Sequence, residues 1–180
     1  MKKSQIRKII IKKRANFKVK DSKFNFNGLL KLLGRGSKNN KIGLYYPIGS
    51  EVSTIELIKN LRTKRYIISL PVIEKNSEMS FYEWTKKTPL NINNFGIPEP
   101  LKLKKTLPST LIIPLVAFDD KLNRLGYGGG FYDRFIDKFE KSKRILKIGL
   151  ALSCQRINKV PTNKFDKKMN YIFTENKVYK

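Results

Sequence analysis

Residues 111–139 read LIIPLVAFDDKLNRLGYGGGFYDRFIDKF, and this stretch predicts a strand, a glycine-rich turn and a helix in succession. The apolar, β-branched run from Leu111 to Val116 is typical of a buried strand, in which Pro114 indicates an irregularity or an edge position. From Phe131 onward, phenylalanines recur every four positions, which predicts a helix over residues 131–140. This order places free backbone N–H groups at the N-terminus of a helix, where they favour an anion.

The glycines at positions 126, 128, 129 and 130 allow two interpretations, a flexible turn or a phosphate site. No Gly-Lys-Ser/Thr follows them, as a phosphate-binding loop requires, and Phe131 stands where a dinucleotide fingerprint has its third glycine. The flanking residues favour the phosphate site. Arg124 offers a positive charge, and Asp133 in the first helical turn suits the helix dipole or a hard cation.

The composition predicts a globular protein and excludes several chemistries. A chain of 180 residues, 40% hydrophobic, suits a single domain over residues 1–180. No apolar run approaches the roughly 18 residues of a membrane span, and no apolar block of a signal peptide follows Met1, so a cytoplasmic protein is expected. With no histidine and only Cys154, a Ser-His-Asp triad, a histidine-ligated metal, a disulfide and a cysteine-clustered zinc site are excluded.

The charge is strongly positive, with 39 Lys and Arg against 14 Asp and Glu, a formal +25. Such a field attracts nucleic acid, anionic membranes or anionic metabolites. The lysines are scattered along the chain, however, and no local motif combines a basic face with interleaved aromatic residues. We therefore expect no specific nucleic-acid partner and no membrane, although a nucleic-acid-binding module remains an alternative.

Outward from residues 111–139, hydrophobic patterning predicts helices and strands in alternation. Helices are expected at residues 4–17 with Ser4 as N-cap, at 21–33, and from a capping-box motif at 53–56 to about Arg62. Strands are expected at 42–46, 66–70 (ended by Pro71), 79–84, 147–152 and 171–174. Residues 95–100 are expected to form a loop. This alternation predicts an α/β fold, a single-domain three-layer sandwich with a mostly parallel central sheet flanked by helices.

Four further residues are candidates for a ligand site. Tyr46 and Glu51 follow the strand predicted at 42–46, and loops at the carboxyl ends of parallel strands line the ligand crevice of such a sheet. Lys3 and Arg7 lie four residues apart and share one helix face. Ordinary surface positions are the alternative for all four. Trp84 suits either stacking on a ring ligand or, more commonly for a large aromatic residue, the core.

The chain resembles the 5-formyltetrahydrofolate cyclo-ligase family, also called 5,10-methenyltetrahydrofolate synthetase, over nearly its whole length. The matching words occur in order: Lys3 with Arg7, Tyr45–Tyr46, Glu51–Thr54, Leu70–Val72, Met79–Phe81, Phe95–Pro100, Ala117–Asp119, Arg124–Arg134, Gly149–Ala151, Gln155, Pro161, Asp166 and Thr174–Glu175. The resemblance implies ATP-dependent closure of 5-formyltetrahydrofolate to 5,10-methenyltetrahydrofolate through a phosphorylated formyl group, with ADP and phosphate released. A related protein that binds a nucleotide without turnover is the alternative, but it would be expected to lose Asp133 or Arg124.

The resemblance also implies site residues. ATP would be bound by Lys3, Ser4, Gln5, Ile6, Arg7, Arg124, Leu125, Gly126, Tyr127, Gly128, Gly129, Gly130, Phe131 and Tyr132; the folate by Tyr46, Glu51, Tyr127, Gly128, Gly129, Gly130 and Phe131; and Mg²⁺ by Asp133 and Asp166. Many members carry a basic residue in the glycine segment, where this chain has Tyr127 and Gly129, so more of the phosphate charge falls to Arg124, Lys3 and Arg7. A monomer is expected.

Overall fold

The structure is a computed structural model that describes residues 1–17, 24–34, 40–75, 78–94 and 96–180. Its central element is a mixed sheet of eight strands. Across the sheet the strands are β12 (Val178–Tyr179), β11 (Tyr171–Phe173), β10 (Leu146–Leu150), β7 (Thr110–Pro114), β1 (Lys41–Gly43), β2 (Ile67–Ile73), β3 (Met79–Glu83) and β6 (Lys105–Thr106). The five strands from β11 to β2 are parallel, and antiparallel pairing begins toward both edges, at β12 and β3. The predicted mostly parallel α/β sheet is confirmed.

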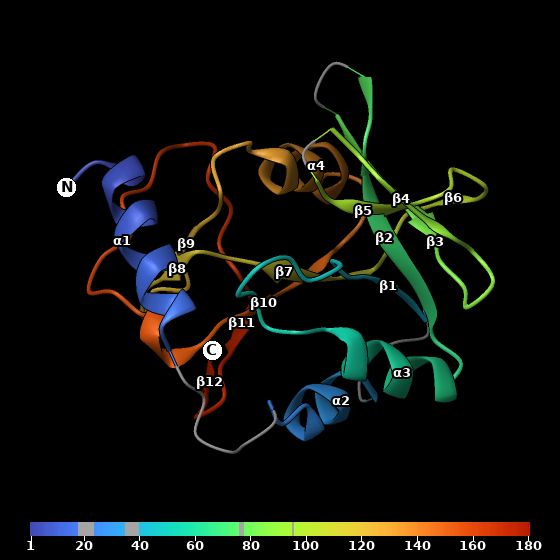
Figure 1. The fold of residues 1–180 in the computed structure, drawn as a ribbon, viewed down its shortest axis with the longest axis horizontal. Helices are drawn as coiled ribbons and strands as arrows, with labels where there is room; N and C mark the ends of the chain where they lie inside the picture. The colour runs from blue at the N-terminus through green and yellow to red at the C-terminus, as the bar shows by residue number, and fades with distance from the viewer. Residues whose placement is uncertain (18–23, 35–39, 76–77, 95) are drawn as a thin grey trace.

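Helices cover both faces of this sheet, which confirms the three layers. In Figure 1, α4 (Phe131–Glu140) lies on one side of the sheet, and α2 (Asn27–Gly34) and α3 (Ile55–Thr63) lie on the other. Strand β7 serves both layers because side chains alternate along a strand. Leu111 and Ile113 belong to the core under α4, whereas Ile112 belongs to the core under α2 and α3.

Helix α1 (Lys3–Ala15) stands outside these layers, beside the hairpin of β8 (Ala117–Phe118) and β9 (Arg124–Leu125) (Figure 1). Its Ile6 and Ile10 are buried in a small separate core. The helix was predicted, but Ser4 as its N-cap is wrong. Lys2 occupies the cap, because its backbone N–H finds the Gln5 side-chain oxygen at 3.0 Å.

Tertiary contacts moved several predicted boundaries. Pro71 does not end its strand. The pairing of β2 with β1 stops at Ser69, so no β1 residue lies opposite Pro71 to accept a hydrogen bond from the N–H that proline lacks. The predicted loop at residues 95–100 is wrong in part, because β5 (Pro98–Pro100) pairs with β4 (Leu90–Ile92). Strand β12 was not predicted.

Two helix predictions also need correction. The capping box at residues 53–56 is wrong, because Thr54 and not Ser53 is the N-cap residue of α3, and the Thr54 hydroxyl donates to the Tyr45 carbonyl at 2.7 Å instead of making a cap hydrogen bond. Helix α2 begins at Asn27 rather than near Asp21, and residues 18–23 lie outside the described part of the chain.

The connections place a crevice between β1 and β7. After β1 the chain crosses through α3 to β2, whereas after β7 it crosses through α4 to β10, on the opposite side of the β1–β7 pair. The loops that follow these two neighbouring strands therefore diverge, and open α/β sheets bind their ligands at such a point. Among the described residues, no helix is long and apolar enough to cross a membrane.

Candidate active site

The glycine segment, residues 126–130, connects β9 to α4 and depends on its glycines for its shape. Gly128 and Gly130 have φ angles of +116° and +66°, in the left-handed region that side chains rarely adopt. A Cβ atom on Gly129 would clash with the ring of Phe131. Gly130 directly precedes α4, so the segment brings backbone close to a helix N-terminus, as the sequence predicted.

Helix α1 places its cations beside this segment. The Arg7 Nε donates to the Gly126 carbonyl oxygen at 2.8 Å, and a Cβ atom on Gly128 would lie 3.4 Å from the Arg7 guanidinium carbon. Lys3, one turn earlier, forms an ion pair with Asp166 at 2.6 Å. Two segments that are about 120 residues apart in the sequence therefore meet here.

A second ion pair lies directly beneath the segment. The Arg124 Nη2 contacts the Asp133 Oδ1 at 2.8 Å, and their side chains are only 4% and 19% exposed. The backbone N–H of Lys167 donates to the same carboxylate at 3.0 Å. Among the described residues, the Arg124 Nε and the Tyr132 hydroxyl are buried and have no hydrogen-bond partner, which makes them two donors that the described fold does not use.

Asp133 and Asp166, the candidate metal ligands, approach the same short segment. Asp166 accepts from the Lys3 ammonium, and its neighbour Lys167 donates its backbone N–H to Asp133. Within the described residues, no group of three or more His, Cys, Asp or Glu could hold a metal by itself. Two carboxylates nevertheless fit Mg²⁺, which prefers oxygen and commonly takes one or two carboxylates together with substrate phosphates.

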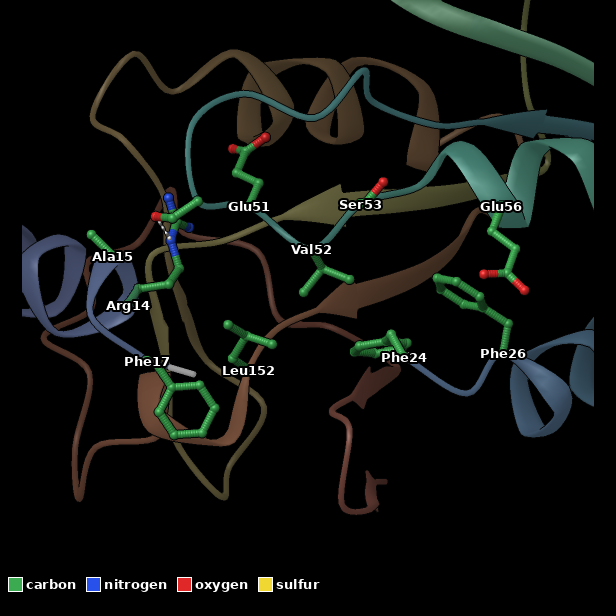
Figure 2. Close-up of a pocket in the computed structure, with 11 residues that line it drawn as sticks. Arg14, Ala15, Phe17, Phe24, Phe26, Glu51, Val52, Ser53, Glu56 and Leu152 are labelled. Atoms are coloured by element: carbon green, nitrogen blue, oxygen red, sulfur yellow. Dashed lines mark hydrogen bonds between the residues drawn. The ribbon is translucent and has the colours of Figure 1, made fainter. Parts of the chain in front are cut away.

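A pocket of about 400 Å³ opens on the other side of the loop that follows β1. We call it the aromatic pocket; it is lined by Arg14, Ala15, Phe17, Phe24, Phe26, Ser50, Glu51, Val52, Ser53, Glu56 and Leu152. In Figure 2, apolar side chains form its middle, and Arg14 and Glu56 stand at opposite ends. The rings of Phe24 and Phe26 pack with centroids 4.9 Å apart. The pocket could hold a flat, partly apolar molecule with a polar edge.

Glu51 is one of two carboxylates, with Glu56, among the described residues that line this pocket, and its contact with a ligand stays a prediction. Burial raises the pKa of Glu51, while a hydrogen bond from Tyr127, the backbone N–H of Ile48 and the positive charge of Arg14 oppose that rise. Burial also raises the pKa of Tyr127, and the negative charge of Glu51 raises it further. The Tyr127 hydroxyl is therefore held protonated beside the carboxylate and can act as a donor.

Tyr46 and Trp84 do not join this group. Tyr46 is not among the described residues that line the aromatic pocket, and its ring meets Trp84 edge-on, with centroids 6.1 Å apart. The Trp84 Nε1 donates to the Thr88 carbonyl at 3.0 Å, and the Arg62 guanidinium lies 4.2 Å from the ring centroid. Trp84 also packs against the core, which favours the core alternative for this residue.

Sequence reasoning missed Arg14. This side chain is 5% exposed, lines the aromatic pocket and donates to the Tyr127 hydroxyl at 2.8 Å. Its spacing from Arg7, seven residues or about two helical turns, places both on one face and was the available signal. That signal is weak in a chain with 39 Lys and Arg residues.

Comparison with known proteins gives one consistent result. The sequence model of the 5-formyltetrahydrofolate cyclo-ligase family matches residues 1–175. The 5-formyltetrahydrofolate cyclo-ligase of Haemophilus influenzae is 40% identical over 139 residues, which cover 73% of each chain. That of Escherichia coli K12 is 32% identical over 145 residues, 77% of this chain and 79% of the relative.

A solved structure agrees. The 5,10-methenyltetrahydrofolate synthetase of Aquifex aeolicus superposes with a TM-score of 0.78 at 30% identity, covering 99% of this chain and 92% of that one. Both the sequence match and the fold extend over the glycine segment, α1 and the loop after β1. The chain therefore belongs to the 5-formyltetrahydrofolate cyclo-ligase family, ligases of folate one-carbon metabolism that use ATP to convert 5-formyltetrahydrofolate to 5,10-methenyltetrahydrofolate.

Proposed function

We propose that this chain performs the family reaction with ATP along the glycine segment and 5-formyltetrahydrofolate in the aromatic pocket. The observation that carries this arrangement is the meeting of both regions at one point. The Arg7 Nε donates a hydrogen bond to the Gly126 carbonyl oxygen at 2.8 Å. The next residue, Tyr127, is hydrogen-bonded to both Arg14 and Glu51. A γ-phosphate at the segment would then lie next to a ligand in the pocket.

The nucleotide wall comprises the glycine segment with Lys3, Arg7, Arg124, Asp133 and Asp166. Its cations would neutralise the phosphates, and the backbone N–H groups before α4 would donate to them. Residues 3–7 and 124–132 together form the proposed ATP site. The unpartnered Arg124 Nε and Tyr132 hydroxyl are donors of the kind that such a ligand needs.

Mg²⁺ would be held by Asp133 and Asp166 together with phosphate oxygens. When bound, it would neutralise phosphate charge in the transferred group. In its absence Arg124 and Lys3 already compensate these carboxylates, so we expect the ion pairs to rearrange as MgATP enters. The ion pairs thus hold both carboxylates at the proposed phosphate site before MgATP binds.

The folate would lie against the ring side chains of the aromatic pocket, with Glu51 as its polar contact. Residues 127–130 of the glycine segment and the adjoining Phe131 would separate it from the nucleotide. Tyr46 would contact it only from outside this pocket. We expect the protein to act on these two small molecules as a cytoplasmic monomer.

The reaction follows from positioning and charge, which suits a chain without histidine. The formyl oxygen attacks the γ-phosphorus, so an O–P bond forms and the bond to ADP breaks. N10 of the folate then attacks the formyl carbon and loses its proton, and phosphate leaves with the former formyl oxygen. Phosphorylation matters because that oxygen is otherwise a poor leaving group, and the cations of the nucleotide wall stabilise the charge on the transferred group.

The test is the absorbance of the methenyl product after mixing purified protein with 5-formyltetrahydrofolate and MgATP. We expect a rise that requires ATP and that Asp133→Asn lowers by about 10²-fold or more, with a higher Mg²⁺ requirement. Asp137→Asn is the matched control, since Asp137 lies one turn further along α4 and pairs with Lys167 at the surface. A folded wild-type protein that gives no ATP-dependent rise would refute the proposal.

A further inference from the structure

Arg14 is a buried cation that the proposed reaction does not yet use. From the last turn of α1 its guanidinium reaches three separate segments. Its Nε donates to the Ser50 hydroxyl at 2.9 Å, its Nη1 to the Leu115 carbonyl at 3.4 Å, and its Nη2 to the Tyr127 hydroxyl at 2.8 Å. These acceptors belong to the loop after β1, the end of β7 and the glycine segment, so one side chain connects three segments of the proposed site to α1.

The geometry requires an arginine. A planar guanidinium directs its donors along fixed directions, whereas a lysine ammonium is a compact charge on a flexible chain. All three acceptors are uncharged oxygens, so the buried positive charge is not cancelled by the groups it touches. Burying such a charge costs free energy, and that cost is commonly found where a site needs the charge.

Tyr127 passes the effect of this charge to Glu51. Arginine can only donate, so the Tyr127 oxygen accepts from Arg14 and its own proton remains free to be donated. The Tyr127 hydroxyl donates that proton in its hydrogen bond to the Glu51 carboxylate. The three side chains therefore form a directed hydrogen-bonded chain, in which Arg14 donates to Tyr127 and Tyr127 donates to the Glu51 carboxylate.

We infer that Arg14 is a positioning residue for the reaction: it fixes the Tyr127 hydroxyl with its proton toward Glu51 and thereby holds that carboxylate oriented for the folate. The inference rests on the proposed function, in which the aromatic pocket takes the folate. It assigns Arg14 to the folate side of the site, although the residue lies on the same helix as the proposed nucleotide ligands Lys3 and Arg7.

The charged and titratable groups around Glu51 give this assignment a pH signature. They are Arg14, Tyr127, Tyr45 and Tyr132. Burial raises the pKa of Glu51, and both the Tyr127 hydrogen bond and the Arg14 charge lower it. Loss of either should let the pKa of Glu51 rise further, so the acid limb of kcat/KM for the folate should move to higher pH.

The experiment compares Arg14→Gln, Tyr127→Phe and the double variant, with kcat/KM measured separately for folate and for ATP. We expect each single variant to lower kcat/KM for the folate by about tenfold, the size of one hydrogen bond to a charged group, and to change KM for ATP by less than about threefold. The double variant should be no worse than Arg14→Gln, because groups acting in one chain are not additive. Both single variants should show the acid limb at higher pH.

One measurement and one further variant keep structural effects apart. Tyr127 is 46% exposed and Tyr127→Phe removes only an oxygen, so this variant should fold even if Arg14→Gln is unstable; thermal unfolding checks both. Lys12→Gln makes the same charge change at an exposed position of α1 and should leave the kinetics within about twofold of wild type.

Three results would overturn the inference: losses that multiply in the double variant, equal effects on ATP and folate, or an acid limb that does not move. Each of these requires a wild-type protein that turns over. A folded wild type without ATP-dependent product would instead refute the proposed function, so the two failures are distinguishable.

Discussion

On the nucleotide wall the charged side chains are matched to opposite charges or backbone oxygens, whereas Glu51, one of the two carboxylates that line the aromatic pocket, is held by uncharged donors. Lys3 pairs with Asp166, Arg124 pairs with Asp133, and Arg7 bonds a carbonyl. Glu51 instead has a pKa raised by burial and is restrained by a tyrosine hydroxyl and a backbone N–H. At the proposed sites we therefore expect MgATP to exchange the ionic partners of the nucleotide wall, and folate binding to depend on the protonation of Glu51.

Removing Arg124 should break the nucleotide wall and give the largest effect. Arg124→Gln leaves Asp133 partly buried without its ion-pair partner, and loss of one partner of a buried pair costs about 3–5 kcal/mol. The phosphates also lose a donor, so kcat should fall by about 10²- to 10³-fold. Steady-state kinetics and urea unfolding measure the two effects.

Arg156→Gln is the matched control for this prediction. Arg156 also pairs with an aspartate, Asp120, but their side chains are 45% and 57% exposed. Exposed pairs contribute at most about 1 kcal/mol, so stability should change little and kcat should stay at the wild-type value. Equal losses in both variants would mean that the wall gains nothing from burying its charges.

The pH dependence of the folate step should come from Glu51 and form the second-largest effect. Its pKa is raised above that of an ordinary glutamate, so the ionised form is lost at a higher pH than usual as pH falls. We expect kcat/KM for the folate to fall on that acid limb, and Glu51→Gln to remove the limb while lowering the plateau by about 10- to 100-fold.

Stability should change in the opposite sense. Because the folded-state pKa of Glu51 is raised, the folded protein binds more protons than the unfolded chain, and the burial of this group costs more as pH rises through that pKa. Glu51→Gln should therefore stabilise the protein by about 1 kcal/mol at neutral pH. The surface variant Glu78→Gln should alter neither the pH profile nor stability. An acid limb that persists in Glu51→Gln would assign it to another group.

Local signals predicted the nucleotide wall better than the pocket. The backbone freedom of the glycines and the four-residue spacing of the phenylalanines are properties of a few neighbouring residues. The sequence alone therefore predicted the turn and the start of α4 at Phe131. The family resemblance supplied Lys3 and Arg7, but the contact that unites them with Gly126 depends on the packing of α1 against β8 and β9. Spacing alone could not have shown it.

The misses have one physical cause, which is that a polar group takes the partner the tertiary fold offers. Ser53 and Glu56 have the right spacing for a capping box, yet the N-cap position of α3 is taken by Thr54, whose hydroxyl donates to the Tyr45 carbonyl nine residues away. Arg14 is one basic residue among 39, and only burial and three distant acceptors distinguish it. Pro71 ends a strand only where a neighbouring strand needs its N–H, and that depends on the length of β1.

The smallest expected effect separates two places where a ring of the folate could stack. Phe24→Leu should raise KM for the folate by about fivefold, since an aromatic contact is worth about 1 kcal/mol beyond its area, with kcat for ATP-saturated enzyme little changed. Trp84→Phe should leave that KM within about twofold. It should cost about 1 kcal/mol in stability, because it removes the hydrogen bond to Thr88 and weakens the contact with the Arg62 guanidinium. If Trp84→Phe raised the folate KM more than Phe24→Leu, the folate ring would stack at the Tyr46–Trp84 pair instead. The proposal that the aromatic pocket binds the folate would then be wrong.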